Sequence, residues 1–283
     1  MRVAGVREIR RRIRAVRNMQ QITKAMKMVA ASRLRKAQEK VVAARPYAIQ
    51  LQEVLAHLAQ TEVDVRHPLL ERRPVENIGY VLFTSDRGLC GGFNANLIRK
   101  TNGLLTEEKA PVKLVTVGRK GRDFYHRGKK NIMAEFTGLG DSPNYSQGRS
   151  IAQEIIRLYE EKEVDEVYLI YTEFVSVINQ KLSFVKLLPI EQPASHATRQ
   201  YIFEPSPEEM MQRLLPKYVE TLIFRSLLES KACELGAKMT AMDSATNNAK
   251  DMIDRLTLVM NRARQAAITK EISEIVGGAA ALE

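Results

Sequence analysis

Residues 6–16, VREIRRRIRAV, decide how this chain folds. Val6, Ile9, Ile13 and Val16 are separated by alternating steps of three and four, which is the spacing of a coiled-coil seam. Arginines occupy most of the positions between them, so the apolar seam and the positive charge share the same helical turns. The stretch predicts a long helix that packs along one face against another helix.

The same periodicity continues toward residue 45 and returns at the other end of the chain. All ten prolines lie between Pro46 and Pro216, so no proline interrupts either flank. We expect the first stripe to continue through Ile22, Met26, Val29, Leu34, Ala37 and Val41. The stripe of the second flank would consist of Met239, Met242, Ala249, Ile253, Leu256, Met260, Ala263 and Ala267, many of them small enough for close helix approach.

Positive charge is concentrated at the N-terminal end. Residues 1–45 contain 14 Lys/Arg and two acids, a net charge of +12, whereas the whole chain carries +11. A basic helix beside a coiled coil could bind nucleic acid, but such a basic region precedes its coiled coil, whereas here the two share the same turns. The pattern favours an acidic protein partner, with nucleic-acid binding as an alternative.

The middle of the chain predicts an α/β sheet. Val-, Ile- and Tyr-rich runs at 77–84, 112–117 and 166–172 alternate with helical patterns at 146–162 and after Asn94, an order typical of parallel strands. A further strand at 182–189 would pair antiparallel with 166–172. The overall prediction is a Rossmann-like α/β domain combined with a long antiparallel coiled coil of two helices.

The positions of the prolines and the change of pattern in the middle divide the chain into three segments. These are a coiled-coil helix in 1–60, an α/β foot domain in 75–190 and a second coiled-coil helix in 206–283. Ser206 and Pro207 mark the start of the last helix, as a cap and a first-turn proline. Because the first helix ends where the middle domain begins and the last starts where it ends, we expect the two to run antiparallel. The longer C-terminal helix should then extend past its partner.

The composition offers little for catalysis. Cys90 and Cys233 are far apart and form neither a disulfide framework nor a CxxC metal pair, which favours a reducing compartment. The four histidines are isolated in the sequence, so we expect no metal and no cofactor. No apolar run approaches the ~20 residues that cross a bilayer.

A glycine-rich loop, SDRGLCGGFN at 85–94, follows the first predicted strand. A dinucleotide could bind there, but the spacing is GxxGG rather than GxGxxG, and the sequence has no GxxxxGK[ST] motif. A tight structural turn explains the glycines better, with Cys90 as a buried inert thiol and Asp86 and Arg87 as a local ion pair or a surface contact. We do not expect the chain to be an enzyme by itself, and a nucleotide-binding enzyme is the second alternative.

Several stretches resemble the gamma-subunit family of rotary ATP synthases. These are 9–13 and 21–31 (QITKAMKMVAA), the GLCGG core of 85–94, and the C-terminal stretches 239–242, 245–249 and 261–279. The resemblance extends over the whole chain. It implies a fold of an antiparallel coiled coil and a Rossmann-like domain, in agreement with the periodicity.

The resemblance also implies a function. The chain would be the non-catalytic central rotor shaft of a proton-translocating ATP synthase, transmitting torque between the membrane c-ring and the catalytic hexamer. Its partners would be the alpha, beta and epsilon subunits and the c-ring, with one copy per complex and no nucleic acid. The resemblance implies that Met26, Arg264, Gln265, Thr269 and Glu271 contact the alpha/beta hexamer. It also implies that Tyr201 and Glu204 of the foot contact the c-ring and epsilon.

Met26 has an alternative role, and the cysteines differ from the pattern of some family members. Met26 could also be an ordinary core filler of the coiled coil. Cys90 and Cys233 are not the nearby pair that serves as a redox switch in chloroplast members of the family. Because the N-terminus shows no evident transit sequence, the expected location is the cytoplasmic face of a bacterial plasma membrane, with peripheral attachment.

Overall fold

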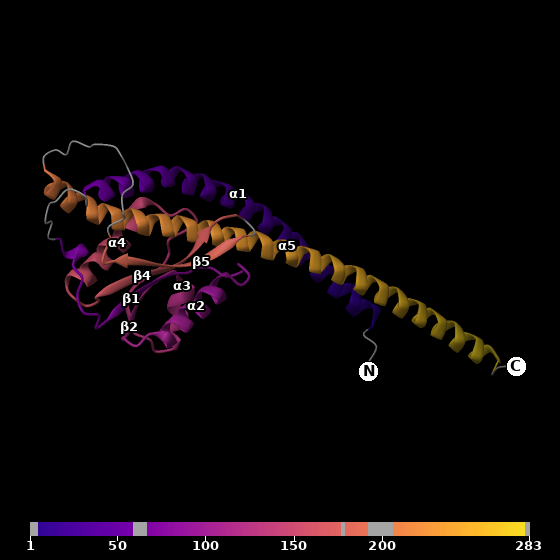
Figure 1. Ribbon diagram of the computed structural model, residues 1–283. Helices are drawn as coiled ribbons and strands as arrows, with labels where there is room; N and C mark the ends of the chain where they lie inside the picture. Colours follow the sequence, from indigo (N-terminus) through magenta and orange to yellow (C-terminus); the bar gives the residue numbers. More distant parts are fainter. Residues whose placement is uncertain (1–4, 59–66, 177–178, 192–205, 281–283) are drawn as a thin grey trace. The chain divides into compact units, whose positions relative to one another are not determined.

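A computed structural model describes residues 5–58, 67–176, 179–191 and 206–280 (Figure 1). The chain divides into two compact units. The first unit combines Met1–Ala30 with Met239–Glu283, and the second comprises Ala31–Lys238. Two long helices, α1 (Val6–Leu58) and α5 (Pro207–Ala280), contribute to both units.

Both long helices continue through a proline, which the expectation of proline-free flanks did not include. Pro46 lies inside α1 and Pro216 inside α5. A proline leaves the carbonyl four residues earlier without its helical partner. Val42 and Gln212, which carry those carbonyls, are exposed, so water can hydrogen-bond to them and the helices continue.

In the first unit, the seam of α1 keeps strict heptad steps. Thr23 and Ala30 lie two and three heptads after Ile9, and all three are at most 8% exposed. Ile22 and Val29, predicted to lie in this seam, are 60% and 49% exposed, so that part of the prediction is wrong. The helix repeat, rather than residue size, decides which side chains face α5.

The α5 segment of the first unit packs antiparallel to α1. Lys27 Nζ lies 2.6 Å from Asp243 Oδ1, and the Thr246 hydroxyl donates to the Thr23 hydroxyl at 2.8 Å, so the two helices advance in opposite directions. Met242 and Ala249 are buried. The rest of the predicted α5 stripe is half-buried as far as Ala263, whereas Ala267 is exposed; the half-buried members are Met239, Ile253, Leu256, Met260 and Ala263.

The second unit is built on one five-stranded sheet in the order β3-β2-β1-β4-β5. β1, β2, β3 and β4 are parallel, and β5 pairs antiparallel with β4, as predicted. The strands are β1 (Ile78–Phe83), β2 (Val112–Val117), β3 (Ile132–Phe136), β4 (Glu166–Phe174) and β5 (Gln180–Leu188). A short 3-10 turn, Pro68–Leu70, precedes β1.

Helices cover both faces of this sheet (Figure 1). On one face, Val81 and Val115 pack in a buried core with side chains of α4 (Tyr145–Glu160) and α5, together with Leu51 and Leu55 of α1. The opposite face carries α2 (Phe93–Glu107) and α3 (Arg119–Arg127). The sheet is therefore the middle layer of a three-layer α/β unit, and the predicted fold class is confirmed.

The runs and helical patterns predicted from the sequence did not include α3 and β3. Gly118 has φ +103° and precedes the helix, and Gly121 lies inside it. A Cβ at Gly121 would lie 2.9 Å from Thr84 Oγ1, so glycine allows α3 to pack directly against the end of β1. The two glycines serve close packing rather than a turn.

Candidate partner-binding surfaces

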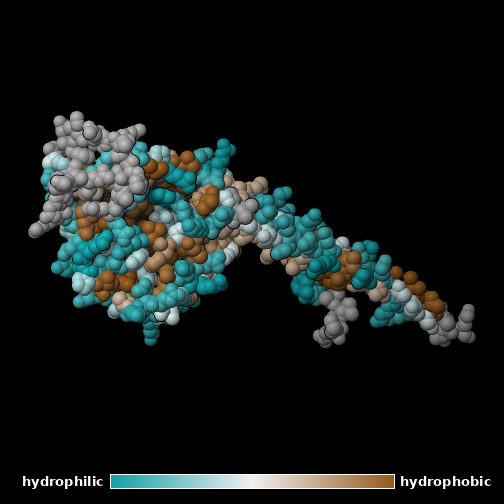
Figure 2. Space-filling view, viewed as in Figure 1, coloured by the Kyte–Doolittle hydropathy of each residue, from teal (hydrophilic) through white to brown (hydrophobic). Residues whose placement is uncertain are grey.

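The last part of α5 is an uncovered helix. Every side chain described in 264–277 is exposed. Ile268, Ile272 and Ile275 are 48%, 56% and 71% exposed, and Val276 is 62% exposed. Steps of four and three place these residues on one face of the helix. Figure 2 shows hydrophobic patches near this end of α5.

A second uncovered apolar stripe runs along α1 in the first unit. Met19, Ile22 and Val29 are 62%, 60% and 49% exposed, and Met26 between them is half-buried. Ile22 and Val29 each lie one residue before a buried seam position, Thr23 and Ala30, which turns them by about 100° from the seam. Ile22 and Val29 thus belong to a surface stripe beside the seam.

The predicted contact residues fall on these two surfaces where the structure describes them. Met26 belongs to the second stripe of α1. The other four lie on the exposed part of α5, where the Thr269 hydroxyl donates to the Gln265 carbonyl at 3.0 Å; these four are Arg264, Gln265, Thr269 and Glu271. Tyr201 and Glu204, predicted for the foot contact, lie outside the described residues.

Cations surround the seam of α1 in the first unit. The side chains of Arg10, Arg11, Arg14 and Arg17 are all exposed. Arg12 reaches Glu8 at 2.6 Å, one helical turn earlier. Since exposed pairs of this kind contribute about 0–1 kcal/mol, they add little to folding and leave a strongly positive surface.

The loop 85–94 after β1 is a structural brace. The Asn94 side chain accepts the Ser85 backbone amide at 3.0 Å and donates to the Ser85 hydroxyl at 2.8 Å. Asp86 accepts the backbone amides of Arg119 and Leu139, each at 3.0 Å. Asp86 therefore fastens the loop to the start of α3 and to the loop after β3. Of the two alternatives given for Asp86 and Arg87, the local ion pair is not observed, and Arg87 instead lies 3.9 Å from Asp141.

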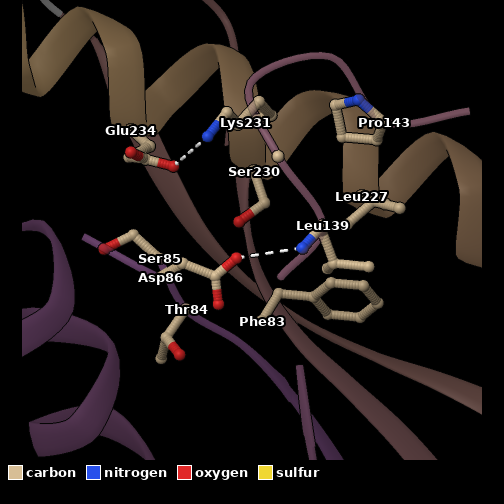
Figure 3. Close-up of a pocket in the computed structure, with 11 residues that line it drawn as sticks. Phe83, Thr84, Ser85, Asp86, Leu139, Pro143, Leu227, Ser230, Lys231 and Glu234 are labelled. Carbon is tan, nitrogen blue, oxygen red and sulfur yellow. Dashed lines mark hydrogen bonds and ion pairs between the residues drawn. The ribbon is translucent and has the colours of Figure 1, made fainter. Parts of the chain in front are cut away.

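At the carboxyl end of β1, where open α/β sheets bind ligands, α5 occupies the space. Figure 3 shows Ser230, Lys231 and Glu234 of α5 beside Ser85 and Asp86. The remaining cavity is about 20 Å³, which is room for a single water. The predicted structural role of the glycine-rich loop is consistent with this packing.

Both cysteines are buried thiols. Cys90 is 2% exposed, and burial raises its pKa above the ordinary value. Cys233 is fully buried, and burial likewise raises its pKa. Neither thiol is a ready nucleophile at neutral pH, as predicted for Cys90. Within the described residues, no cluster of His, Cys, Asp or Glu could hold a metal ion.

Comparison with known proteins decides the family. The family model described as ATP synthase matches residues 5–282. The ATP synthase gamma chain of Desulfitobacterium hafniense is 69% identical over 281 residues, covering 99% of this chain and 100% of that protein. This chain belongs to the ATP synthase gamma chain family. The gamma chain of Heliobacterium modesticaldum is 56% identical, covering 98% and 99% of the two chains.

Solved structures share the gamma fold. A chain from the central stalk and c-ring of Tetrahymena thermophila mitochondrial ATP synthase has 25% identity and a TM-score of 0.63, covering 79% of this chain and 99% of that one. A chain of Euglena gracilis mitochondrial ATP synthase has a TM-score of 0.69 at 18% identity, covering 98% and 94%. As a gamma subunit, this chain is part of the central stalk of ATP synthase. In the described parts of this gamma subunit, no helix is both long and apolar enough to span a membrane.

Sequence reasoning missed that the second stripe of α1 is exposed. Counting heptads strictly from Ile9 reaches Thr23 and Ala30 and leaves Ile22 and Val29 outside the seam. The heptad spacing therefore did contain the correct seam. The prediction instead followed the larger apolar side chains, which lie one residue before the seam positions.

Proposed function

We propose that the chain is a non-catalytic rotor shaft that transmits torque between a membrane c-ring and the catalytic alpha/beta hexamer. The observation that carries this proposal is the uncovered apolar face of α5, formed by Ile268, Ile272, Ile275 and Val276. A row of large apolar side chains in water marks a site where another protein covers them. An apolar face also suits a rotating contact, because it can slide without exchanging charged hydrogen bonds.

The charge of the first unit supports the same partner. Exposed arginines surround α1, and acidic lever segments of beta subunits would complement them. Charges in such an exposed setting mainly accelerate and orient association. The apolar stripes would then supply close contact, and the cations would supply orientation.

The proposed contacts with the hexamer are Met26 on α1 and the exposed residues of α5. Met26 lies in the uncovered stripe with Ile22 and Val29, which supports a partner contact over a place in the core. Arg264 and Glu271 are exposed charges beside the apolar face of α5. For the epsilon subunit and the c-ring, the proposed contacts are Tyr201 and Glu204, on the basis of the family resemblance.

The non-catalytic role is supported by the end of β1. α5 fills the place where a sheet of this kind would hold a nucleotide, and the cavity left is about 20 Å³. The matched structure from Tetrahymena contains the central stalk with the c-ring. Together with the bacterial relatives, this supports peripheral attachment at the cytoplasmic face of a bacterial plasma membrane. One copy per complex is proposed on the basis of the family resemblance.

Arg264→Gln tests the proposal in the reconstituted complex. We expect ATP-driven proton pumping to fall several-fold relative to ATP hydrolysis, while the melting temperature of the chain stays unchanged, because Arg264 is exposed in the free chain. Arg99→Gln, at an exposed position of α2, is the matched control and should affect neither quantity. Equal losses of melting temperature and coupling in the Arg264 variant would contradict the proposal.

A further inference from the structure

A small cavity with cationic walls lies inside the second unit. Its volume is about 100 Å³, and it is bounded by α1, by the loop between β3 and α4, and by α5. Arg33, Lys36 and Lys40 line it from α1 and Lys231 from α5. Asp141 is the single acid among the described residues that line it. The cavity is distinct from the space at the end of β1, although Lys231 borders both.

Two of these four cations form ion pairs with acidic side chains. The Arg33 guanidinium hydrogen-bonds to the Asp141 carboxylate. Lys231 Nζ lies 3.8 Å from the same carboxylate and 2.8 Å from Glu234. Arg87, outside the cavity lining, also lies 3.9 Å from the Asp141 carboxylate. This single carboxylate therefore faces three cations, and its capacity to neutralise them is already used.

The other two cations are not neutralised. Lys40 Nζ donates to the Ser142 hydroxyl at 2.5 Å, which is a neutral acceptor. Lys36 is exposed and forms no ion pair with any residue that the structure describes. Arg33, Lys36 and Lys40 are spaced by three and four residues, so they lie on one helix face and repel one another. An anion bound between them would relieve this repulsion.

The size and lining of the cavity indicate what kind of anion fits. Sites for drug-sized ligands begin at about 300 Å³, so a cavity of this volume holds one small group rather than a whole nucleotide. Ala37 and Leu228 contribute apolar walls, which lower the local dielectric and strengthen ionic hydrogen bonds. Ammonium, guanidinium and hydroxyl donors around one small space suit a tetrahedral oxyanion.

We propose that this cavity binds a phosphate group. Lys36 and Lys40 would donate to its oxygens, with Arg33 exchanging part of its bond to Asp141 for the same ligand. The phosphate is either inorganic phosphate or the terminal phosphate of a nucleotide whose sugar and base stay outside. Because α1, α5 and the loop all line the cavity, the bound anion would contact these three segments of the second unit. The proposal is independent of the rotor function.

Calorimetric titration of the full-length chain with inorganic phosphate at low ionic strength tests the proposal. We expect saturable binding of one phosphate per chain. The double variant Lys36→Gln/Lys40→Gln should bind at least about tenfold more weakly, since two charge-assisted hydrogen bonds are lost. The control double variant Lys24→Gln/Lys100→Gln removes the same charge from exposed sites outside the cavity and should change the affinity less than about twofold.

Asp141→Asn gives a readout that a purely structural role would not produce. Removing the competing carboxylate should tighten phosphate binding, because Arg33 becomes free to bind the ligand. Titrations with ADP and adenosine distinguish the two sources of the phosphate group. Binding of ADP but not adenosine would show that the site accepts the phosphate of a nucleotide. Binding of inorganic phosphate but neither ADP nor adenosine would identify the inorganic ion as the ligand. The proposal is overturned by absence of saturable binding, by equal weakening in the two double variants, or by weaker binding in Asp141→Asn.

Discussion

At the residue scale, the contact between β1 and α3 depends on two glycines. Gly118 adopts φ +103°, and a Cβ there would lie 2.2 Å from the Thr84 carbonyl oxygen. The Thr84 hydroxyl also accepts the Gly121 backbone amide at 2.9 Å. The start of α3 is therefore fixed against Thr84, the residue before the loop that carries the GLCGG motif.

Gly118→Ala should destabilise the second unit. A non-glycine residue in this backbone region, together with a clash against main chain, should lower the free energy of unfolding by about 2–4 kcal/mol. Gly103→Ala is the matched control, since no atom lies within 4 Å of a Cβ added there and the residue is helical. It should raise the free energy of unfolding by up to about 1 kcal/mol. Urea denaturation measures both, and a neutral Gly118 variant would contradict the argument.

Glu220 should make the stability of the second unit depend on pH. Its burial opposes ionisation, but hydrogen bonds from Lys217 and Tyr145 outweigh this and hold its pKa below the ordinary value of 4.5. A lowered pKa in the folded state contributes stability that is present above about pH 4.5 and is lost as pH falls through the folded-state pKa. Tyr145→Phe removes one donor at 2.6 Å and brings the folded-state pKa of Glu220 closer to 4.5, so the stability lost as pH falls should be smaller than in the native chain.

The measurement is urea denaturation between about pH 6 and pH 3 for the native chain, Tyr145→Phe and Glu220→Gln. Glu220→Gln should show the smallest change in unfolding free energy over this range, because the titrating group is gone. The interpretation fails if the three proteins lose stability in parallel.

At the element scale, the coiled coil of the first unit is held by small side chains. Ala30 on α1 and Ala249 on α5 are 2% and 7% exposed. The ion pair that joins the two helices, Lys27 with Asp243, has side chains that are 41% and 46% exposed. A pair this exposed contributes about 0–1 kcal/mol to stability. Burial of the seam residues, the two alanines among them, therefore contributes more to holding these helices together than the ion pair does.

Ala30→Leu should disrupt this seam. A larger side chain has no room where two helices approach closely, so the free energy of unfolding should fall by about 1–3 kcal/mol. Ala266→Leu, at an exposed position of α5, should stay within about 0.5 kcal/mol of the native chain. Thermal unfolding followed by circular dichroism separates the two, and equal melting temperatures would show that the seam tolerates bulk.

The elements differ in how well the sequence predicted them. β2 and the start of α5 follow local signals: a Val-rich run gives Val112–Val117, and the Ser206 hydroxyl accepts the Glu209 amide as a helix cap. α3 could not be predicted locally, because Gly121 looks like a helix breaker and its reason is a contact with distant Thr84. Such contacts depend on tertiary structure, which a window of sequence does not contain.

At the scale of the whole molecule, charge segregation and the family motifs predicted the function, whereas the sequence prediction missed the uncovered stripe of α1. The apolar stripe predicted from the sequence included Ile22 and Val29 in the seam, but both face solvent. A chain that left these residues and the apolar face of α5 uncovered would be prone to association. The account therefore requires a partner that encloses both surfaces.

Rotation of the chain inside its complex tests this account most directly. Cys90 and Cys233 are buried, so a cysteine introduced by Lys109→Cys, at an exposed site, would take a visible probe selectively. The chain would be assembled with alpha and beta subunits and observed as single complexes during ATP hydrolysis. We predict that ATP drives one-directional rotation of the probe relative to the immobilised hexamer. Sustained ATP hydrolysis by complexes that retain the chain but show a stationary probe would contradict the account.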